Sequence, residues 1–260
     1  MPAHDDLDLL IEAARAAGQT ALQFTGARAR RWEKPDGTGL VTEADLAVNA
    51  LLEDRLRCAR ADYGWLSEES EDDPARLARE AVFVVDPIDG TRGFAQGSSD
   101  WAHSLAIARG GRVTEAVIFL PARDKLYVAR AGGGARLNGA PVKVSGRATL
   151  AGAEILTSRA AMDPRHWRAG PPRIRRAHRP SLAYRMALVA QGRYDGILTV
   201  FPSWEWDIAA GDLILREAGA EVTDKTGHPL AFNNPQPRLP GVVAAPRKLH
   251  AAFLANLKAG

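Results

Sequence analysis

The sequence predicts an α+β protein, in which helices and strands mix without the strict alternation of a doubly wound sheet. Two observations support this fold class. The chain has 260 residues, of which 46% are hydrophobic and 25% are charged, as in a globular protein with a sizeable core. Its apolar residues have helical spacing in some segments and form short strand-like runs in others, and several of those runs follow one another directly.

Two helices are expected near the start of the chain. Residues 5–24 place apolar residues near one face and acidic residues in the first turn, and a second helix is expected over residues 44–60. The turn residues of Lys34-Pro35-Asp36-Gly37-Thr38-Gly39 predict a loop between them. Cys58 is the only cysteine, so no disulfide can form within the chain, and we expect a reducing compartment and an inert thiol.

Strands are expected to follow these helices. The wholly apolar run at residues 81–85 is typical of a strand covered on both faces, and we expect it to stop at Asp86-Pro87. Further strand-like runs with turn residues between them predict an antiparallel meander, at residues 104–108, 113–120 and 125–131.

An irregular, arginine-rich segment at residues 164–180 is the candidate for a boundary or a flexible loop between two halves. We expect residues 1–150 to form an N-terminal α+β half with metal-binding acids. Residues 151–260 are expected to form a C-terminal half that completes the site, so that the two halves make one compact unit. The C-terminal half is expected to have helices at residues 182–190 and 207–218, strands at 195–200 and 241–245, and a closing helix.

The most informative segment is Asp86-Pro87-Ile88-Asp89-Gly90-Thr91, which follows the buried strand. Pro87 interrupts the ladder of backbone hydrogen bonds, and Gly90 permits a ligand to approach the backbone closely. The turn can therefore direct two carboxylates, the Ile88 carbonyl and the following amides into one space. Oxygen ligands of this kind suit Mg²⁺, and free amides suit a phosphate group. The alternative is an ordinary Asp-Gly turn with solvated acids.

Three other motifs carry acids in similar settings. Glu68 and Glu69 follow a strand-like segment, where they add a metal ligand and a base, or simply form an exposed acidic loop. Thr42 and Asp45 form a capping box before the second helix, which leaves the Asp45 carboxylate able to accept a hydrogen bond from a nearby hydroxyl. Asp207 lies at the positive end of a helix dipole, either as a ligand or as an N-cap.

Together these motifs resemble the inositol monophosphatase family of metal-dependent, lithium-sensitive phosphatases. Residues 85–91 are similar to the first signature of the family, and Trp206-Asp207-Ile208-Ala209-Ala210-Gly211 is similar to the second. Residues 40–45 and 67–70 match two minor motifs in the same order. The resemblance covers residues 5–255 and implies a layered α/β/α/β/α sandwich.

The resemblance also implies roles for individual residues. Two or three Mg²⁺ ions are expected on five ligands, namely Glu68, Asp86, the Ile88 carbonyl, Asp89 and Asp207. Gly90 and Thr91 are expected to bind the phosphate through their amides. Asp45 and Thr91 are expected to activate the attacking water, with Glu68 as a third catalytic residue. Lys34 lies in the loop that closes over the metals in the family. Two metals can flank a phosphate, lower the pKa of a bound water and stabilise the leaving oxygen, so a Mg²⁺-dependent phosphomonoesterase is expected.

The residues around the second signature predict the substrate. Between Asp195 and Glu205 there is no carboxylate, which argues against a dedicated inositol reader. Trp204-Glu205-Trp206-Asp207 resembles the corresponding motif of 3'(2'),5'-bisphosphate nucleotidases. The ring of Trp204 could offer an apolar face to a nucleobase. Arg185 lies near the place where those enzymes have a basic residue, which suits a second phosphate. We therefore expect Arg185 and Glu205 to bind substrate. We expect 3'-phosphoadenosine 5'-phosphate to be favoured over inositol monophosphate and histidinol phosphate.

Other classes of protein fit the sequence less well. Cys58 lacks the adjacent histidine of a cysteine phosphatase, and no Walker-type nucleotide motif is present. The alternative from a different class is a non-catalytic protein that binds phosphate or nucleic acid. The arginines between Arg165 and Arg185 are its main support, although a solvated arginine-rich loop is the favoured explanation for them.

The expected partner is a small phosphorylated metabolite, without nucleic acid or membrane, and the resemblance implies a homodimer. The first residues lack the basic start and apolar run of a signal peptide. No apolar stretch approaches the ~20 residues that a membrane-spanning helix needs. We therefore expect a cytoplasmic protein.

Overall fold

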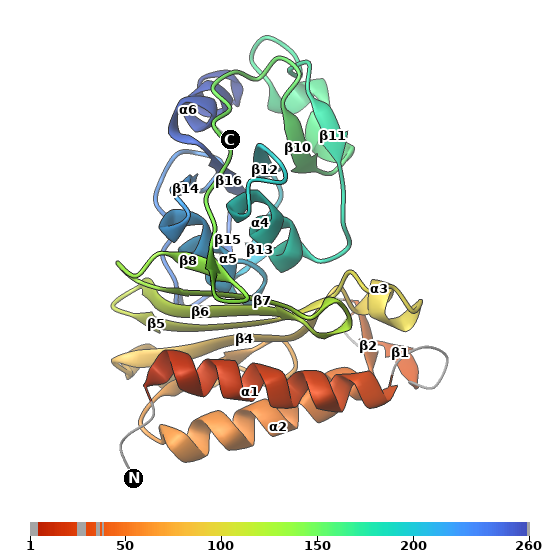
Figure 1. The fold of residues 1–260 in the computed structure, drawn as a ribbon, viewed down its shortest axis with the longest axis vertical. Helices are drawn as coiled ribbons and strands as arrows, with labels where there is room; N and C mark the ends of the chain where they lie inside the picture. Colours follow the sequence, from red (N-terminus) through yellow and green to blue (C-terminus); the bar gives the residue numbers. More distant parts are fainter. Residues whose placement is uncertain (1–4, 25–29, 35–36, 38, 259–260) are drawn as a thin grey trace.

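Helices and sheets alternate in five layers along the long axis of the molecule, in the computed structural model shown in Figure 1. The order is a helix pair, a seven-stranded sheet, a second helix pair, a five-stranded sheet and a last helix. This order confirms the layered α+β sandwich. The structure describes residues 5–24, 30–34, 37 and 39–258. Pro35, Asp36 and Thr38 of the expected loop lie outside that part of the chain.

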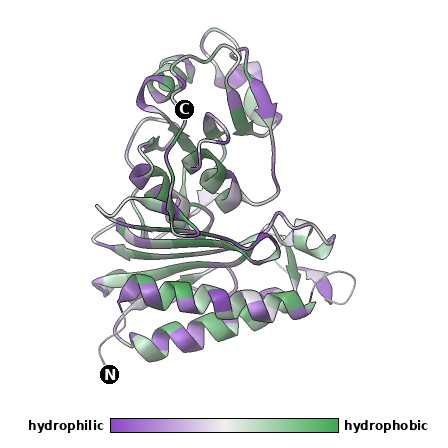
Figure 2. Ribbon diagram, viewed as in Figure 1, coloured by the Kyte–Doolittle hydropathy of each residue, from purple (hydrophilic) through white to green (hydrophobic). Residues whose placement is uncertain are grey.

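The outer helix pair is α1 (Asp6–Ala21) and α2 (Glu43–Ala59), close to the expected bounds. A hairpin of β1 (Arg31–Glu33) and β2 (Leu40–Thr42) lies between them in the chain. Figure 2 shows the strands beside these helices as largely hydrophobic and the helices themselves as mixed. That pattern is typical of helices with one face on a sheet and one face in water.

The seven-stranded sheet has the order β3-β4-β5-β6-β7-β8-β9. In it, β3 and β4 run parallel and the other neighbours run antiparallel, which confirms the expected meander. The strands are β3 (Gly64–Ser67), β4 (Ala81–Asp89), β5 (Ala102–Arg109), β6 (Arg112–Leu120), β7 (Lys125–Arg130), β8 (Ala135–Leu137) and β9 (Ala140–Pro141).

Strand β4, next to the edge strand β3, continues through Pro87 to Asp89, so the expected stop at Asp86-Pro87 is wrong. Asp86 pairs with Ser104 and Asp89 pairs with Ala102 on β5, and the register shifts between these two pairs. Pro87 therefore disturbs the ladder without ending it, because β5 stays paired on both sides of the irregularity. The two aspartates thus belong to one distorted strand end.

Burial on both faces explains why β4 is apolar before Asp86. Phe83 and Val85 belong to the core that the sheet shares with α1 and α2, whereas Val82 and Val84 belong to the core on the opposite face. Alternate side chains of a strand point to opposite faces, so a strand between two helix layers is apolar at every position.

The inner helix pair is α4 (Leu182–Ala190) and α5 (Glu205–Glu217), and it lies between the two sheets. The five-stranded sheet has the order β11-β10-β12-β16-β14. Its strands are β10 (Glu154–Thr157), β11 (Arg175–Ala177), β12 (Gly196–Thr199), β14 (Glu221–Thr223) and β16 (Val242–Ala245). The last helix, α6 (Arg247–Asn256), packs on its outer face through Leu249 and Phe253. Among the described residues, no helix is both long and apolar enough to cross a membrane.

The arginine-rich segment at residues 164–180 lies within the second half and does not separate the halves. Its strand β11 pairs in parallel with β10, which precedes the segment in the chain. The two sheets are joined instead by residues 142–153, between β9 and β10. The segment was expected to be a boundary because its composition is irregular, but three of its residues complete the edge of a sheet.

Gly211 sets how closely α5 approaches α4. A Cβ at this position would lie 2.5 Å from Sδ of Met186 and 2.8 Å from its Cβ. We predict that Gly211→Ala lowers the free energy of unfolding by about 1–3 kcal/mol, because the two helices must move apart. Urea unfolding measures this change. Gly146→Ala is the matched control, since a Cβ at Gly146 would meet nothing within 4 Å. Equal stability of the two variants would contradict this account of the packing.

Candidate functional site

Three carboxylates meet where β4 ends and α5 begins. Oxygen atoms of Asp86, Asp89 and Asp207 all lie within 4.8 Å of one another. Asp86 and Asp89 are buried, and Asp207 is partly buried. Asp207 is the third residue of α5 and Trp204 occupies the N-cap, so Asp207 is not the N-cap residue, although its carboxylate accepts a hydrogen bond from the Trp204 amide. The three residues are called the acid cluster below.

Burial and mutual repulsion act on the acid cluster together. Burial raises the pKa of Asp86 well above its ordinary value, and the negative charges of Glu68, Asp89 and Asp207 raise it further. Burial likewise raises the pKa of Asp207, and the charge of Asp89 adds to the effect. Oδ1 of Asp86 is buried without a hydrogen-bond partner in the described protein. Such an atom is costly to leave unpaired, so the cluster suits a bound cation.

The N-terminus of α4 holds Asp89 in place. The Ser181 hydroxyl donates to Asp89 Oδ2 at 2.6 Å, and the Ala183 amide donates to the same atom at 2.5 Å. Ser181 also caps α4, because its side chain accepts a hydrogen bond from the Tyr184 amide. A serine before a helix is a readable capping signal. Its contact with Asp89 could not be read from the sequence, because it joins residues far apart in the chain.

Asp45 caps α2 and also forms a hydrogen bond with Thr91, the residue that follows the turn at Gly90. It forms the expected capping box with Thr42, whose amide donates to Oδ2 at 2.8 Å. Its other oxygen, Oδ1, accepts a hydrogen bond of 3.1 Å from the Thr91 hydroxyl. Burial raises the pKa of Asp45 to about 6. The Thr91 hydroxyl also lies 3.1 Å from the Ile88 carbonyl, so the three groups form one network.

Gly90 makes the turn between β4 and the short helix α3 (Thr91–Ala95). Its φ is 96°, in the left-handed region that favours glycine. A Cβ there would lie 3.2 Å from the Asp100 carbonyl and 3.3 Å from Cβ of Ser181. The first amides of a helix have no acceptor within it, so the backbone at Thr91 presents donors at this turn.

Glu68 lies near the acid cluster without joining it. Its carboxylate accepts a 3.0 Å hydrogen bond from Lys34 Nζ, which also lies 2.9 Å from a carboxylate oxygen of Glu69. The charge of Glu68 nevertheless raises the pKa values of Asp86 and Asp207. Burial raises the pKa of Glu69 to about 7, although Lys34 opposes the shift. In this structure the Lys34 ammonium is therefore the positive group that pairs with the Glu68 carboxylate.

Two residues of β5 support the cluster, although no motif in the sequence singled them out. His103 Nδ1 bonds to the Pro87 carbonyl, between the two aspartates of β4. Burial lowers the pKa of His103 to about 4, so the imidazole is neutral at pH 7 and donates this hydrogen bond. The Ser104 hydroxyl donates to the Trp206 carbonyl at 3.0 Å. Strand β5 therefore fixes the distorted end of β4 and the start of α5.

Glu205 points into the protein, which corrects its expected role in substrate binding. Its side chain is 0% exposed. Its carboxylate accepts hydrogen bonds from the amides of Asn233 and Asn234, at 2.7 Å and 2.9 Å, and from Nδ2 of Asn234 at 2.6 Å. These donors satisfy a buried carboxylate. Glu205 therefore anchors the loop before β15 (Arg238–Leu239) to the start of α5.

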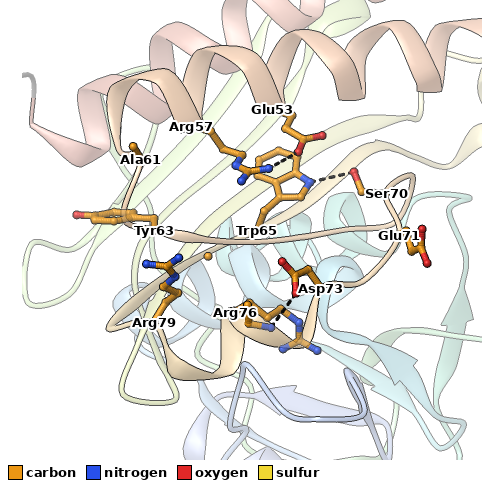
Figure 3. A pocket seen from close by; sticks show the side chains of 12 residues that line it. Glu53, Arg57, Ala61, Tyr63, Trp65, Ser70, Glu71, Asp73, Arg76 and Arg79 are labelled. Atoms are coloured by element: carbon orange, nitrogen blue, oxygen red, sulfur yellow. Dashed lines mark hydrogen bonds and ion pairs between the residues drawn. The ribbon is translucent and has the colours of Figure 1, made fainter.

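Arg76 extends this anchor to the first half of the chain. Its guanidinium bonds both carboxylate oxygens of Asp72, at 2.6 Å and 2.9 Å, Oδ1 of Asn233 at 2.6 Å and the Asn234 carbonyl at 2.9 Å. Figure 3 shows the side chains that line a cavity between α2 and the segment after β3, with Arg76 among them. The volume of this cavity is about 100 Å³. None of the carboxylates of the acid cluster lines this cavity. The cavity therefore lies beside Arg76 and is separate from the acid cluster.

Arg185 lies one turn after Ser181 on α4. Its Nε donates to the Ser181 carbonyl at 3.2 Å. Burial lowers the pKa of the Arg185 guanidinium, and the negative charges of Asp89 and Asp207 oppose that change. The structure therefore brings this expected substrate-binding residue close to two members of the acid cluster.

The Trp204 ring contacts two neighbouring side chains. Its ring is stacked on that of Trp206, with centroids 4.8 Å apart and planes inclined by 10°. The guanidinium of Arg238 lies 5.0 Å from the centroid of the Trp204 ring. An aromatic stack and a cation–π contact therefore hold the Trp204 ring within the protein.

Comparison with known proteins agrees with this geometry. Residues 4–259 match the sequence profile of the Inositol monophosphatase family. An inositol-1-monophosphatase of Rhizobium meliloti (strain 1021) is 34% identical over 237 residues, which cover 85% of this chain and 86% of that protein. A Nus factor SuhB of Pseudomonas aeruginosa is 34% identical over 235 residues, with 85% and 86% covered. An IMPase of Thermotoga maritima has a TM-score of 0.82 at 28% identity, with 97% and 96% covered.

The match extends over almost the whole chain, and it includes every segment that contributes to the acid cluster. The chain belongs to the inositol monophosphatase family, whose members are metal-dependent phosphatases that hydrolyse phosphate monoesters.

Proposed function

We propose that this phosphatase hydrolyses the monophosphate ester of a small polyol, for which inositol 1-phosphate is the reference substrate. Water is the proposed nucleophile and Mg²⁺ the proposed cofactor. The observation that carries the proposal is the meeting of three carboxylates, within 4.8 Å of one another, beside the Asp45–Thr91 pair.

The donor set of the acid cluster fits a hard divalent cation. Mg²⁺ prefers carboxylate and carbonyl oxygens, and the unpartnered Asp86 Oδ1 is such an atom. The proposed ligands of two or three ions are Glu68, Asp86, the Ile88 carbonyl, Asp89 and Asp207. Glu68 becomes a metal ligand when the Lys34 ammonium leaves its carboxylate or binds only one of the two carboxylate oxygens. When bound, Mg²⁺ would polarise the phosphate and stabilise the leaving oxygen.

Asp45 and Thr91 are the proposed acceptors for the proton of the attacking water. A pKa of about 6 keeps Asp45 ionised above neutral pH while leaving it basic enough to accept a proton. The Thr91 hydroxyl donates to Asp45, so its lone pair is available to a water on its other side. The proton of that water then passes by way of Thr91 to Asp45.

The backbone at Gly90 and Thr91 is the proposed phosphate-binding element. The first amides of α3 have no acceptor within the helix, and the helix dipole favours an anion at this end. The close packing of Gly90 against Asp100 and Ser181 fixes the direction of these amides. Arg185 is the proposed contact for the rest of the substrate, because its guanidinium can donate to hydroxyl or phosphate oxygens.

The bisphosphate nucleotide that the motif spelling favours is not supported. The Trp204 ring is stacked on Trp206 and contacts Arg238, and the Glu205 carboxylate is occupied by Asn233 and Asn234. Contacts within the protein therefore already engage both side chains. Two relatives named inositol-1-monophosphatase are 34% and 32% identical to this chain, which favours the alternative substrate class.

Three further expectations stay proposals. A small phosphorylated metabolite is the partner that the acid cluster supports best. The homodimer rests on the family resemblance, and the molecular mass in solution tests it. The cytoplasmic location rests on the sequence of the first residues.

We predict that Asp86→Asn stabilises the metal-free protein at pH 8. The pKa of Asp86 is raised in the folded state, so its contribution to stability is present below its unfolded pKa and is lost as pH rises through the folded pKa. An asparagine cannot ionise and avoids that loss. Mg²⁺ at a hundred times its Kd should stabilise the wild type by about 2.7 kcal/mol, and the variant by much less.

Thermal unfolding at pH 5 and pH 8, with EDTA or Mg²⁺, measures both effects. Asp62→Asn is the control, because Asp62 is exposed and lies outside the cluster. An equal response of Asp86→Asn and Asp62→Asn to Mg²⁺ would sink the metal assignment.

We predict faster phosphate release from inositol 1-phosphate than from 3'-phosphoadenosine 5'-phosphate or histidinol phosphate.

Asp45→Asn should lower kcat by roughly 10²–10⁴-fold with little change in KM, because it removes a proton acceptor. The wild-type rate should fall as pH drops below about 6, where Asp45 gains a proton. Bound Mg²⁺ would lower the pKa of Asp45 and so move this fall in rate to a lower pH. A preference for the bisphosphate nucleotide would contradict the substrate class, and an unchanged kcat in Asp45→Asn would contradict the base.

A further inference from the structure

Positive charge is concentrated in one segment of the chain. Residues 164–194 contain eight arginines and no aspartate, glutamate or lysine. The whole chain has 34 basic and 31 acidic residues, so the rest of it has 26 basic and 31 acidic residues and is net negative. The positive net charge of the protein therefore comes from this segment alone.

The fold brings three of these arginines to one cavity. The cavity has a volume of about 280 Å³ and lies beside the edge strand β11 and the connection from α4 to β12. Its lining comprises Glu154, Arg175, Arg176, Ala177, Arg193 and Tyr194. Glu154 is the only acid in this lining, and its carboxylate lies 3.7 Å from the Arg175 guanidinium. Three guanidinium groups and one carboxylate leave a formal charge of +2 around the cavity.

One wall of the cavity is held in place by a further arginine. Arg179 donates to the Tyr194 hydroxyl at 2.9 Å, and its guanidinium lies 5.8 Å from the centroid of the Tyr194 ring. The Arg176 guanidinium is anchored at the other side by the Thr157 carbonyl, at 3.4 Å. These contacts hold the Tyr194 ring and the Arg176 guanidinium in place without a bound ligand.

The positive field around the cavity also acts on neighbouring groups. The pKa of His178 is lowered by burial and then by the charges of Arg185, Arg176 and Arg179. The pKa of Lys125 is lowered by burial and then by the charges of Arg123 and Arg193. The guanidinium groups that line one cavity repel one another unless a counter-ion lies between them. The cavity therefore favours an anion.

We propose that this cavity binds the phosphate group of a small phosphomonoester, at a site separate from the acid cluster. A phosphomonoester carries a charge of about −1.5 to −2 at pH 7, which matches the charge of the lining. Arginine forks bind phosphate oxygens in pairs, which lysine cannot do. The volume of the cavity is near the lower end for ligand sites, so it suits a small molecule. The proposal does not depend on which ester the acid cluster hydrolyses.

Isothermal titration in EDTA tests this site, with inositol 1-phosphate and with inorganic phosphate as probes. EDTA keeps divalent cations out of the acid cluster, whose carboxylates then repel an anion. The wild type should bind one inositol 1-phosphate per chain. The double variant Arg175→Gln/Arg193→Gln should bind at least tenfold more weakly, because it loses two charged donors. Arg165→Gln is the matched control, since Arg165 belongs to the same segment but pairs with Asp163 at 2.8 Å, away from this lining.

The two probes distinguish what the site reads. Equal affinity for both means that it reads the phosphate alone, and tighter binding of the ester means that the polyol contributes; both support the proposal. Absence of saturable binding by the wild type would overturn it, as would equal weakening in Arg165→Gln. Tighter binding of a short oligonucleotide than of the ester, lost in the double variant, would assign the surface to a polymer and also overturn the proposal. Thermal unfolding confirms that each variant is folded.

Discussion

The packing of three carboxylates beside one another is the constraint on which the rest of the structure depends. Burial strips hydration from Asp86 and Asp89 at the end of β4 and from part of Asp207 on α5, and each carboxylate is repelled by the others. A fold can keep such groups together only if the surrounding packing outweighs this cost. Strand β4 meets that need, because it is buried on both faces between two helix layers. A bound cation would remove the repulsion, which is why the same feature that strains the metal-free protein serves catalysis.

The acid cluster joins the two halves of the chain, so its geometry depends on how the halves pack. Asp86 and Asp89 come from the first sheet, and Asp207 comes from a helix of the layer between the sheets. Ser181 on α4 holds Asp89, and Ser104 on β5 holds the start of α5. Behind the cluster, the hydrogen bonds of Arg76 and Glu205 to one shared loop tie the same two halves together. A small shift of α4 or α5 would therefore change the distances between the carboxylates.

Much of the fold and the centre of the site could be predicted from the sequence. Apolar periodicity gave α4 and the helices of the outer layer, and the acids of the two signatures do meet in space. Local patterns failed where a distant strand decides the outcome, as at Pro87, which β5 keeps within β4. Glu205 was assigned to substrate because of its neighbours in the sequence, but a loop almost 30 residues later saturates its carboxylate. His103 gave no signal at all, because its role depends on a carbonyl of another strand.

The central claim is that Asp86, Asp89 and Asp207 together hold divalent cations. Crystals grown with Mn²⁺ and measured for anomalous scattering test it most directly, because the signal locates the ion itself. We predict at least one strong anomalous peak at bonding distance from oxygens of all three carboxylates, and its loss in Asp86→Asn crystals. Anomalous peaks only on exposed acids, or an unchanged peak in Asp86→Asn, would contradict it.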